Sequence, residues 1–245
     1  MIPEDHPRCR SLIARELIAE GMMNGIVAPE GMSAHGRGEA FDYLIGEKTT
    51  GSAFLAEKTA AAMLLMAKRP VISVNGNTAA LAAPLVADLQ QASGAAVEVN
   101  LFHRTEERVE KISGHLEKNG AEVLKGIPRR LLPLSHARAL CLEDGIYAAD
   151  TVLVPLEDGD RCGALRSLGK NVITIDINPL SRTARTATLT IVDELTRAMP
   201  NISSGCFELQ NKPSECTRLI TSHDNNYLLR SALEEIMENL SNALD

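Results

Sequence analysis

Residues 73–81, SVNGNTAAL, combine residue types that could bind phosphate. A β-rich run enters an Asn-Gly turn that opens a predicted helix, and free N–H groups at a helix start attract phosphate. Gly76 would let a ligand approach the backbone closely, while Asn75, Asn77 and Thr78 could add side-chain hydrogen bonds. This turn is therefore a candidate phosphate site, although an ordinary capped strand-to-helix turn would have the same pattern.

A second candidate is the acidic turn in residues 152–161, VLVPLEDGDR, which follows a predicted buried strand. Carboxylates at the end of such a strand could hold Mg²⁺ together with substrate phosphates, or orient an incoming amine. Asp158 and Asp160 are the metal candidates, and Glu157 is the candidate for the amine. The alternative is a solvated turn in which an Asp caps the next helix.

A third candidate lies in residues 174–186, TIDINPLSRTART, where Asp176 and Asn178 follow another predicted strand. An acid at a strand end can bond ribose hydroxyls, and neighbouring Arg and hydroxyl groups can clamp phosphate. With Arg182 and Thr183 in the following loop, the segment indicates a nucleotide site.

Two segments nearer the N-terminus carry isolated cations. Arg37 lies between glycines in HGRGEAFDY, and the glycine-rich stretch 28–48 predicts turns and loops, from which its guanidinium could bind phosphate or carboxylate. Residues 46–53, GEKTTGSA, are not a P-loop, because Glu47 occupies the position where that motif requires Gly. Lys48 could still reach a phosphate as a point charge.

The elements that must position these groups indicate an α/β fold. Helices predicted at 7–24 and 50–68 precede strands that alternate with helices, which is typical of a mostly parallel, Rossmann-like sheet with helices on both faces. Ligands bind such sheets at the C-terminal ends of the strands, where the candidates fall. The predicted strands are 71–74, 96–101, 121–124, 151–154, 172–176 and 189–192, with amphipathic helices at 104–118 and 226–243.

We expect one domain over residues 1–245, with N-terminal and C-terminal helical additions. It would comprise an N-terminal helical segment (1–68), a nucleotide-binding core (69–200) and a C-terminal helical tail (201–245). The apolar stripe of the last helix suits either the core or a second subunit.

Composition, charge and missing motifs disfavour several classes of protein. The formal net charge of −7 argues against non-specific binding to nucleic acid or to an anionic membrane. The five scattered cysteines include no C-x-x-C pair, which favours reduced thiols in a cytoplasmic protein over a zinc cage or a disulfide framework. No secretory signal or membrane-spanning run is expected. The missing G-x-G-x-x-G disfavours a dinucleotide-dependent oxidoreductase.

Taken together, these segments resemble the archaeal phosphopantothenate synthetase (4-phosphopantoate–β-alanine ligase) family. The similar stretches cover most of residues 2–200; they are IPEDHPR, SLIARELIAEGM, GIVAPEG, AHGRGEAFDYL, SVNGNTAAL, VEVNLFHRTEERV, GIYAADTVLVPLEDGDR and DINPLSRTART.

The resemblance implies a homodimeric enzyme that joins 4-phosphopantoate to β-alanine in coenzyme A biosynthesis, splitting ATP to AMP and pyrophosphate. At position 194 the family more often has Asn than the Glu found here. The ATP contacts that it implies are Arg15, Arg37, Asp176, Ile177, Asn178, Arg182, Thr183, Glu194 and Leu195.

A mechanism through an acyl-adenylate follows from this hypothesis. Such chemistry mainly needs charge neutralisation and alignment, and we assign catalytic roles to Glu157, Arg37 and Lys48. Two other functions stay open: an ATP-dependent small-molecule kinase, and a nucleotide-sensing module without catalysis.

Overall fold

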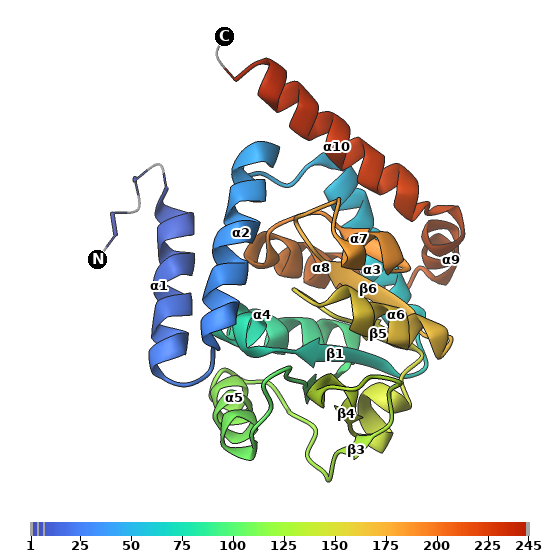
Figure 1. The fold of residues 1–245 in the computed structure, drawn as a ribbon. Helices are drawn as coiled ribbons and strands as arrows, with labels where there is room; N and C mark the ends of the chain where they lie inside the picture. The colour runs from blue at the N-terminus through green and yellow to red at the C-terminus, as the bar shows by residue number, and fades with distance from the viewer. Residues whose placement is uncertain (1, 4, 7, 244–245) are drawn as a thin grey trace.

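A five-stranded parallel sheet forms the centre of the molecule, as predicted (Figure 1). The computed structural model describes residues 2–3, 5–6 and 8–243, so Pro7, predicted in the first turn of a helix, lies outside the described residues. Ile72 aligns with Val97 on one side and with Leu153 on the other. The strands are β1 (Pro70–Val74), β2 (Ala96–Val99), β5 (Thr151–Leu153), β6 (Asn171–Ile175) and β7 (Leu189–Ile191).

The strand order is β2-β1-β5-β6-β7, with every neighbouring pair parallel. Counted along the chain, this is the 2-1-3-4-5 order of doubly wound sheets, in which the chain reverses direction across the sheet between β1 and β5. The connections leave these two strands toward opposite sides, so a crevice opens at their C-terminal ends.

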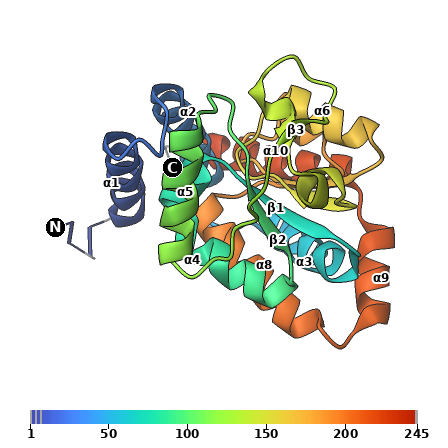
Figure 2. The same cartoon turned by 90° about the horizontal axis from the view of Figure 1, so that it is seen from below.

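Alternate residues of the strands pack against two different layers. Ile72, Leu153 and Ile173 face a core formed with α3 (Gly51–Met66), α4 (Gly76–Ser93) and α8 (Leu195–Leu209), seen together in Figure 2. Val71 and Val152 face the opposite layer. That layer contains α6 (Gly159–Ser167), the π-helical turn Glu143–Tyr147, the 3₁₀ turn Ala137–Ala139 and the hairpin of β3 (Arg129–Arg130) and β4 (Leu140–Cys141).

The glycine-rich stretch 28–48 is mostly helical, so the prediction of loops there was wrong. Helix α2 (Pro29–Ile45) begins with Pro at its first position and ends at Gly46, whose φ of 90° closes the helix in the left-handed conformation. Its interior glycines are tolerated because packing offsets their cost. A side chain at Gly31 would collide with Asn77 of α4, so this glycine permits close contact between the two helices.

Helices α1 (Cys9–Met23) and α2 stand side by side at the edge of the molecule where the strands end (Figure 1). The polar face of α5 (Glu106–Lys118) is solvated, and its buried Ile112 and Leu116 pack beside β2 and α4. The predicted strand 121–124 is reduced to a single bridge between Val97 and Val123.

The C-terminal segment contains three helices: α8, α9 (Pro213–Ser222) and α10 (Asn225–Ser241). Helix α8 runs across the predicted boundary between the core (69–200) and the tail (201–245), and it packs on α3 and α4. In α10, Leu228 and Ile236 are buried, whereas Met237 and Leu240 are exposed, so the apolar stripe is divided between core and surface. No helix in residues 2–3, 5–6 and 8–243 is long and apolar enough to cross a membrane.

Candidate active site

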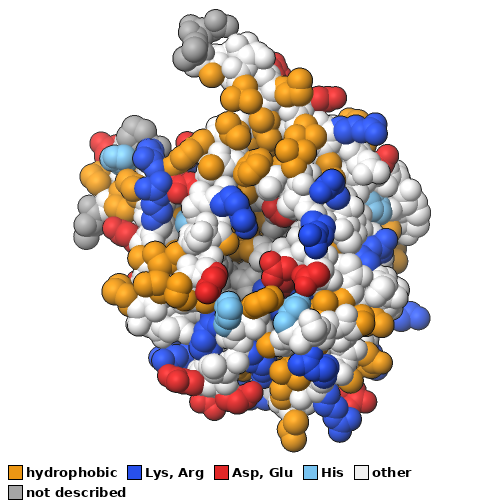
Figure 3. All heavy atoms as spheres, in the orientation of Figure 1, with side chains coloured by type: hydrophobic (Ala, Val, Ile, Leu, Met, Phe, Trp, Pro, Cys, Tyr) orange, Lys and Arg blue, Asp and Glu red, His pale blue; other side chains and the backbone are white. Residues whose placement is uncertain are grey.

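A cavity of about 1090 Å³ opens where the strands end, and residues that follow all five strands line it. Parallel strands are about 4.8 Å apart, so the edge from β2 to β7 spans roughly 19 Å. Helices α1 and α2 form the outer wall. Figure 3 shows acidic, basic and histidine side chains around a hollow at the centre of this face. The cavity is large enough for a nucleotide together with a second small acid.

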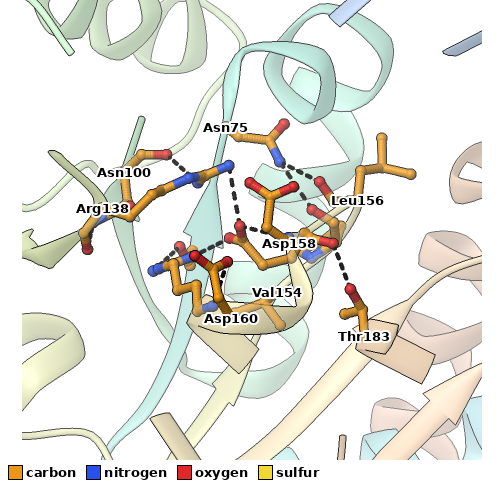
Figure 4. Close-up of polar contacts among 12 residues, drawn as sticks. Asn75, Asn100, Arg138, Val154, Leu156, Asp158, Asp160 and Thr183 are labelled. Atoms are coloured by element: carbon orange, nitrogen blue, oxygen red, sulfur yellow. Dashed lines mark hydrogen bonds and ion pairs between the residues drawn. The ribbon is translucent and has the colours of Figure 1, made fainter. Parts of the chain in front are cut away.

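Asn75 joins the two strands at the point where the sheet reverses. Its amide nitrogen donates to the carbonyl oxygens of Pro155 and Leu156, both at 3.0 Å, and its oxygen accepts the Thr78 N–H at 3.0 Å (Figure 4). Leu156 has a φ of 52°, a left-handed conformation that is costly for a side chain of this size. The predicted ligand contact Asn75 therefore has a structural task, which is to hold the strained turn after β5.

The next residue, Glu157, is buried in an ion cluster with two arginines. Its carboxylate pairs with Arg161 and with Arg138, the latter at 3.1 Å, and these side chains are 0% and 6% exposed. Arg161 also donates to Ser73 at 2.9 Å, and Arg138 to the Asn100 carbonyl at 2.8 Å. Burial raises the pKa of Glu157, but the two guanidinium groups outweigh it and hold the pKa below its ordinary value.

Asp158 and Asp160 differ in their surroundings. Asp160 accepts the Arg161 N–H at 2.8 Å and pairs with His136 at 2.8 Å. No hydrogen bond or ion pair to the Asp158 carboxylate occurs within the described residues, although the side chain lines the cavity. Burial and the neighbouring charge of Glu157 raise the pKa of Asp158, so a cation beside it would be favoured.

The end of β6 forms a compact polar turn. Asp176 accepts the hydroxyl of Ser181 and, at 3.0 Å, the N–H of Asn178. The Asn178 side chain in turn accepts the Leu180 N–H at 2.9 Å. Asp176, Ile177 and Asn178 all line the cavity, as predicted for an acid at a strand end.

Four arginines that line the cavity carry no ion pair within the part of the chain that the structure describes: Arg10 of α1, Arg37 of α2, Arg108 of α5 and Arg182 of α7 (Arg182–Thr186). Arg108 donates to the carbonyls of His103 and Ile26, whereas Arg37 and Arg182 lie near the turn at Asp176 and the acidic turn. The charge of Arg37 acts on Asp176, and the stem of Arg182 packs on Gly159, where a Cβ atom would lie 2.7 Å from its carbons. Thr183 donates its hydroxyl to the Glu157 carbonyl at 2.7 Å, which fastens α7 to the acidic turn. The free guanidinium groups could bind an anion.

The end of β7 forms the last part of the wall. Glu194 caps α8 by accepting the Thr196 N–H at 2.8 Å, and Leu195 lines the cavity beside it. In the same wall, Arg197 bridges Asp193 at 2.7 Å and Asp42 of α2.

At the start of α4, the predicted side-chain contacts are buried or used within the protein, whereas backbone N–H groups stay free within the described residues. The open side of Gly76 faces the Ile26 carbonyl, which a Cβ atom would strike, so the glycine serves chain packing and not ligand approach. Asn77 donates to the Gly31 carbonyl at 2.8 Å. Thr78 is fully buried and does not line the cavity. The N–H groups of Gly76 and Asn77 have no partner within the described residues.

Two other predicted cations are engaged outside the cavity lining. Arg15 pairs with Glu39 at 2.9 Å, and Lys48 pairs with Glu235 of α10 at 2.7 Å. Neither residue lines the cavity, so the structure does not bring them together with Arg37 and Arg182.

Sequence reasoning missed Arg138, Arg197 and Phe102, which also line the cavity. The spacing of Asp193 and Arg197, four residues apart at a helix start, was a usable signal. Arg138 gave none, because the carboxylate that it binds lies 19 residues further along the chain.

The donor set at the acidic turn fits a hard cation such as Mg²⁺. No group of three or more His, Cys, Asp or Glu side chains within the described residues could hold a metal by itself. Mg²⁺ commonly binds through one or two carboxylates and completes its shell with substrate phosphates and water. Asp158 offers one carboxylate of this kind, whereas Asp160 is held by His136.

The family model and the relatives that this chain resembles all indicate the same family. Residues 52–239 match the family model described as phosphopantothenate/pantothenate synthetase. The chain is 58% identical to 4-phosphopantoate–beta-alanine ligase of Methanospirillum hungatei over the full length of both chains. It is 55% identical to the Methanosarcina mazei ligase, over 98% of this chain and 95% of the relative. It is 49% identical to the Thermococcus onnurineus ligase, over 98% and 94% respectively. The chain therefore belongs to the phosphopantothenate/pantothenate synthetase family.

Proposed function

We propose that this chain joins 4-phosphopantoate to β-alanine, using ATP and releasing AMP and pyrophosphate, as a step of coenzyme A biosynthesis. The full-length likeness to relatives that bear the name of this ligase supports the activity. The main support for the proposed site is the presence of two guanidinium groups without an ion pair in the described residues, Arg37 and Arg182, beside the polar turn at Asp176.

The ATP subsite is proposed at the β6 and β7 end of the cavity. Arg37 and Arg182 would neutralise the phosphates, and the remaining lone pairs of Asp176 would accept ribose hydroxyls. The Leu195 N–H at the start of α8 has no partner within the described residues and would donate to the nucleotide. We assign Arg15 and Lys48 to the α1–α2 and α2–α10 contacts instead, because both are engaged there.

The phosphate of 4-phosphopantoate would lie at the start of α4. The unbonded N–H groups of Gly76 and Asn77 and the helix dipole favour a dianion there. Asp158 would hold Mg²⁺, which neutralises phosphate charge when it is bound. Since both oxygens of Glu157 are held by arginines, we propose that it acts through the turn it anchors and not on β-alanine.

The reaction that this arrangement supports has two steps. A carboxylate oxygen of 4-phosphopantoate attacks the α-phosphorus of ATP, the bond to the β-phosphate oxygen breaks, and pyrophosphate leaves. The amine of β-alanine, after losing a proton, then attacks the acyl carbon and AMP leaves. Alignment and charge neutralisation by the two arginines supply most of what these steps require.

We further propose a single-domain, cytoplasmic homodimer. The main core cluster includes residues from Ile18 of α1 to Leu228 of α10, which supports one domain. Exposed Met237 and Leu240 on α10 supply apolar surface for a second subunit.

Product analysis tests the function. The purified protein is incubated with Mg-ATP, 4-phosphopantoate and β-alanine, and AMP, ADP and pyrophosphate are measured, with unphosphorylated pantoate as the control. AMP formation that needs both the phosphorylated acid and β-alanine is the expected result. ADP would indicate a kinase instead, and ATP binding without turnover would indicate a sensing module.

A further inference from the structure

A cluster of acids at the β7 end of the cavity contains more carboxyl groups than cations, and two of its members, Asp42 and Asp193, line the cavity. Asp42, Asp193 and Glu57 are all buried, and Arg197 is the only cation that pairs with them within the described residues. All three nitrogens of Arg197 donate to Asp42 or Asp193. Glu57, in the middle of α3, is left without a counterion.

The hydrogen bonds around this third acid require a proton. One oxygen of Glu57 accepts the side-chain N–H of Asn201 at 2.9 Å, while the other is buried and receives no donor within the described residues. A side-chain hydrogen bond with Asp193 contributes to the raised pKa of Glu57, and two ionised carboxylates cannot form such a bond. Asp193 accepts the Thr49 hydroxyl at 2.6 Å and the Glu194 N–H at 2.7 Å and pairs with Arg197, which favours Asp193 as the ionised acceptor and Glu57 as the donor.

The surroundings of Glu57 also raise its pKa and so favour its protonated form. Burial first, and then the charge of Asp193, raise the pKa of Glu57 to about 9, with Arg197 opposing them weakly. From α9, Glu215 is occupied by Lys58 on the outer face of α3. Burial and the neighbouring acid therefore both favour the neutral form of Glu57.

We propose that Glu57 is a positioning residue for ATP: its carboxyl group keeps its proton, donates it to Asp193, and so holds Arg197 and the Glu194–Leu195 turn at the cavity. The inference rests on the proposed function, because that turn lines the proposed nucleotide subsite. Loss of the proton would place two adjacent carboxylates behind the turn and displace it. Binding of ATP would then weaken, while the chemistry of bound ATP would change little.

Kinetics from pH 7 to pH 10 test this role in the full-length protein. In the wild type, KM for Mg-ATP should rise above about pH 9, by up to tenfold per pH unit, while kcat changes less than about twofold. Glu57→Gln keeps the shape and a donor N–H without the titration, so its KM should match the wild type at pH 7 and stay flat. Glu57→Leu removes the donor, and its KM should be about tenfold higher at every pH.

The matched control is Glu98→Gln. Glu98 is also buried and its pKa is also raised by burial, but it accepts the N–H groups of Leu142 and Ile146 away from the cavity. This variant should keep the alkaline rise in KM. The proposal is overturned if Glu57→Gln retains that rise, or if the rise occurs in kcat alone.

Thermal unfolding of the nucleotide-free protein separates this inference from the proposed function. Because the pKa of Glu57 is raised on folding, the folded state binds a proton that the unfolded state releases above about pH 4.5. Wild-type Tm should therefore fall relative to Glu57→Gln between about pH 5 and pH 9 and then level off. Parallel Tm profiles would exclude the shared proton, whereas absence of AMP formation in every variant would refute only the ligase activity.

Discussion

Glu157 and Asp158 are neighbours in the chain, and replacing each by its amide should have opposite consequences. In Glu157→Gln, the guanidinium groups of Arg138 and Arg161, 6% and 0% exposed, lose their shared counterion. Removing one partner of a buried ion pair costs about 3–5 kcal/mol. For a chain of this size that corresponds to roughly 6–20 °C in Tm.

Asp158→Asn should leave Tm unchanged or slightly higher. Its carboxylate has no partner within the described residues, and burial with the charge of Glu157 disfavours its ionised form. If it holds Mg-ATP, removing its charge costs about 1.5–3 kcal/mol in the ternary complex, or roughly tenfold to a hundredfold in kcat/KM.

The assays are thermal unfolding and AMP formation at pH 7.5, with unfolding repeated at low pH. Since the pKa of Glu157 is lowered on folding, its contribution is present above about pH 4.5 and is lost as the pH falls through the folded-state pKa. The Tm difference between wild type and Glu157→Gln should therefore shrink in acid. A Glu157→Gln variant that melts like the wild type but makes no AMP would refute this reasoning. It would indicate that Glu157 acts directly on the substrate.

Four further substitutions test helix α2 and the candidate site. Gly36→Ala should stabilise α2 by about 0.5–1 kcal/mol, because a Cβ atom there meets open space, whereas Gly31→Ala should destabilise the fold through its clash with Asn77; denaturant unfolding compares them. Lys48→Ala should leave kcat/KM within about twofold, since its partner lies on α10, and a large loss would contradict our assignment. Arg37→Ala should lower kcat/KM at least tenfold with Tm unchanged, and unaltered kinetics would remove it from the site.

The sequence predicted that the candidate site lies at the C-terminal ends of the parallel strands. Runs of Val and Ile that alternate with amphipathic helices predicted a parallel sheet, and the acidic and amide residues after β5 and β6 indeed line the cavity. These residues converge because the C-terminal ends of parallel strands share one edge, whatever the details of packing.

The sequence could not predict which charged side chains remain free of ion pairs in the folded protein. The pairing of Arg15 with Glu39, or of Lys48 with Glu235, depends on helices that meet only in the folded state. The glycines of α2 were misassigned for the same reason, because the contact at Gly31 is made by a residue 46 positions away. Local sequence patterns predicted where each group lies along the C-terminal edge of the sheet. Tertiary contacts determine what each side chain binds.

The most direct test of the ligase account follows one oxygen atom. With 4-phosphopantoate carrying heavy oxygen in its carboxylate, attack on the α-phosphorus should transfer one labelled atom to AMP and leave the other in the amide product, as mass spectrometry would show. Label in inorganic phosphate formed together with ADP, or no transfer at all, would contradict the acyl-adenylate route.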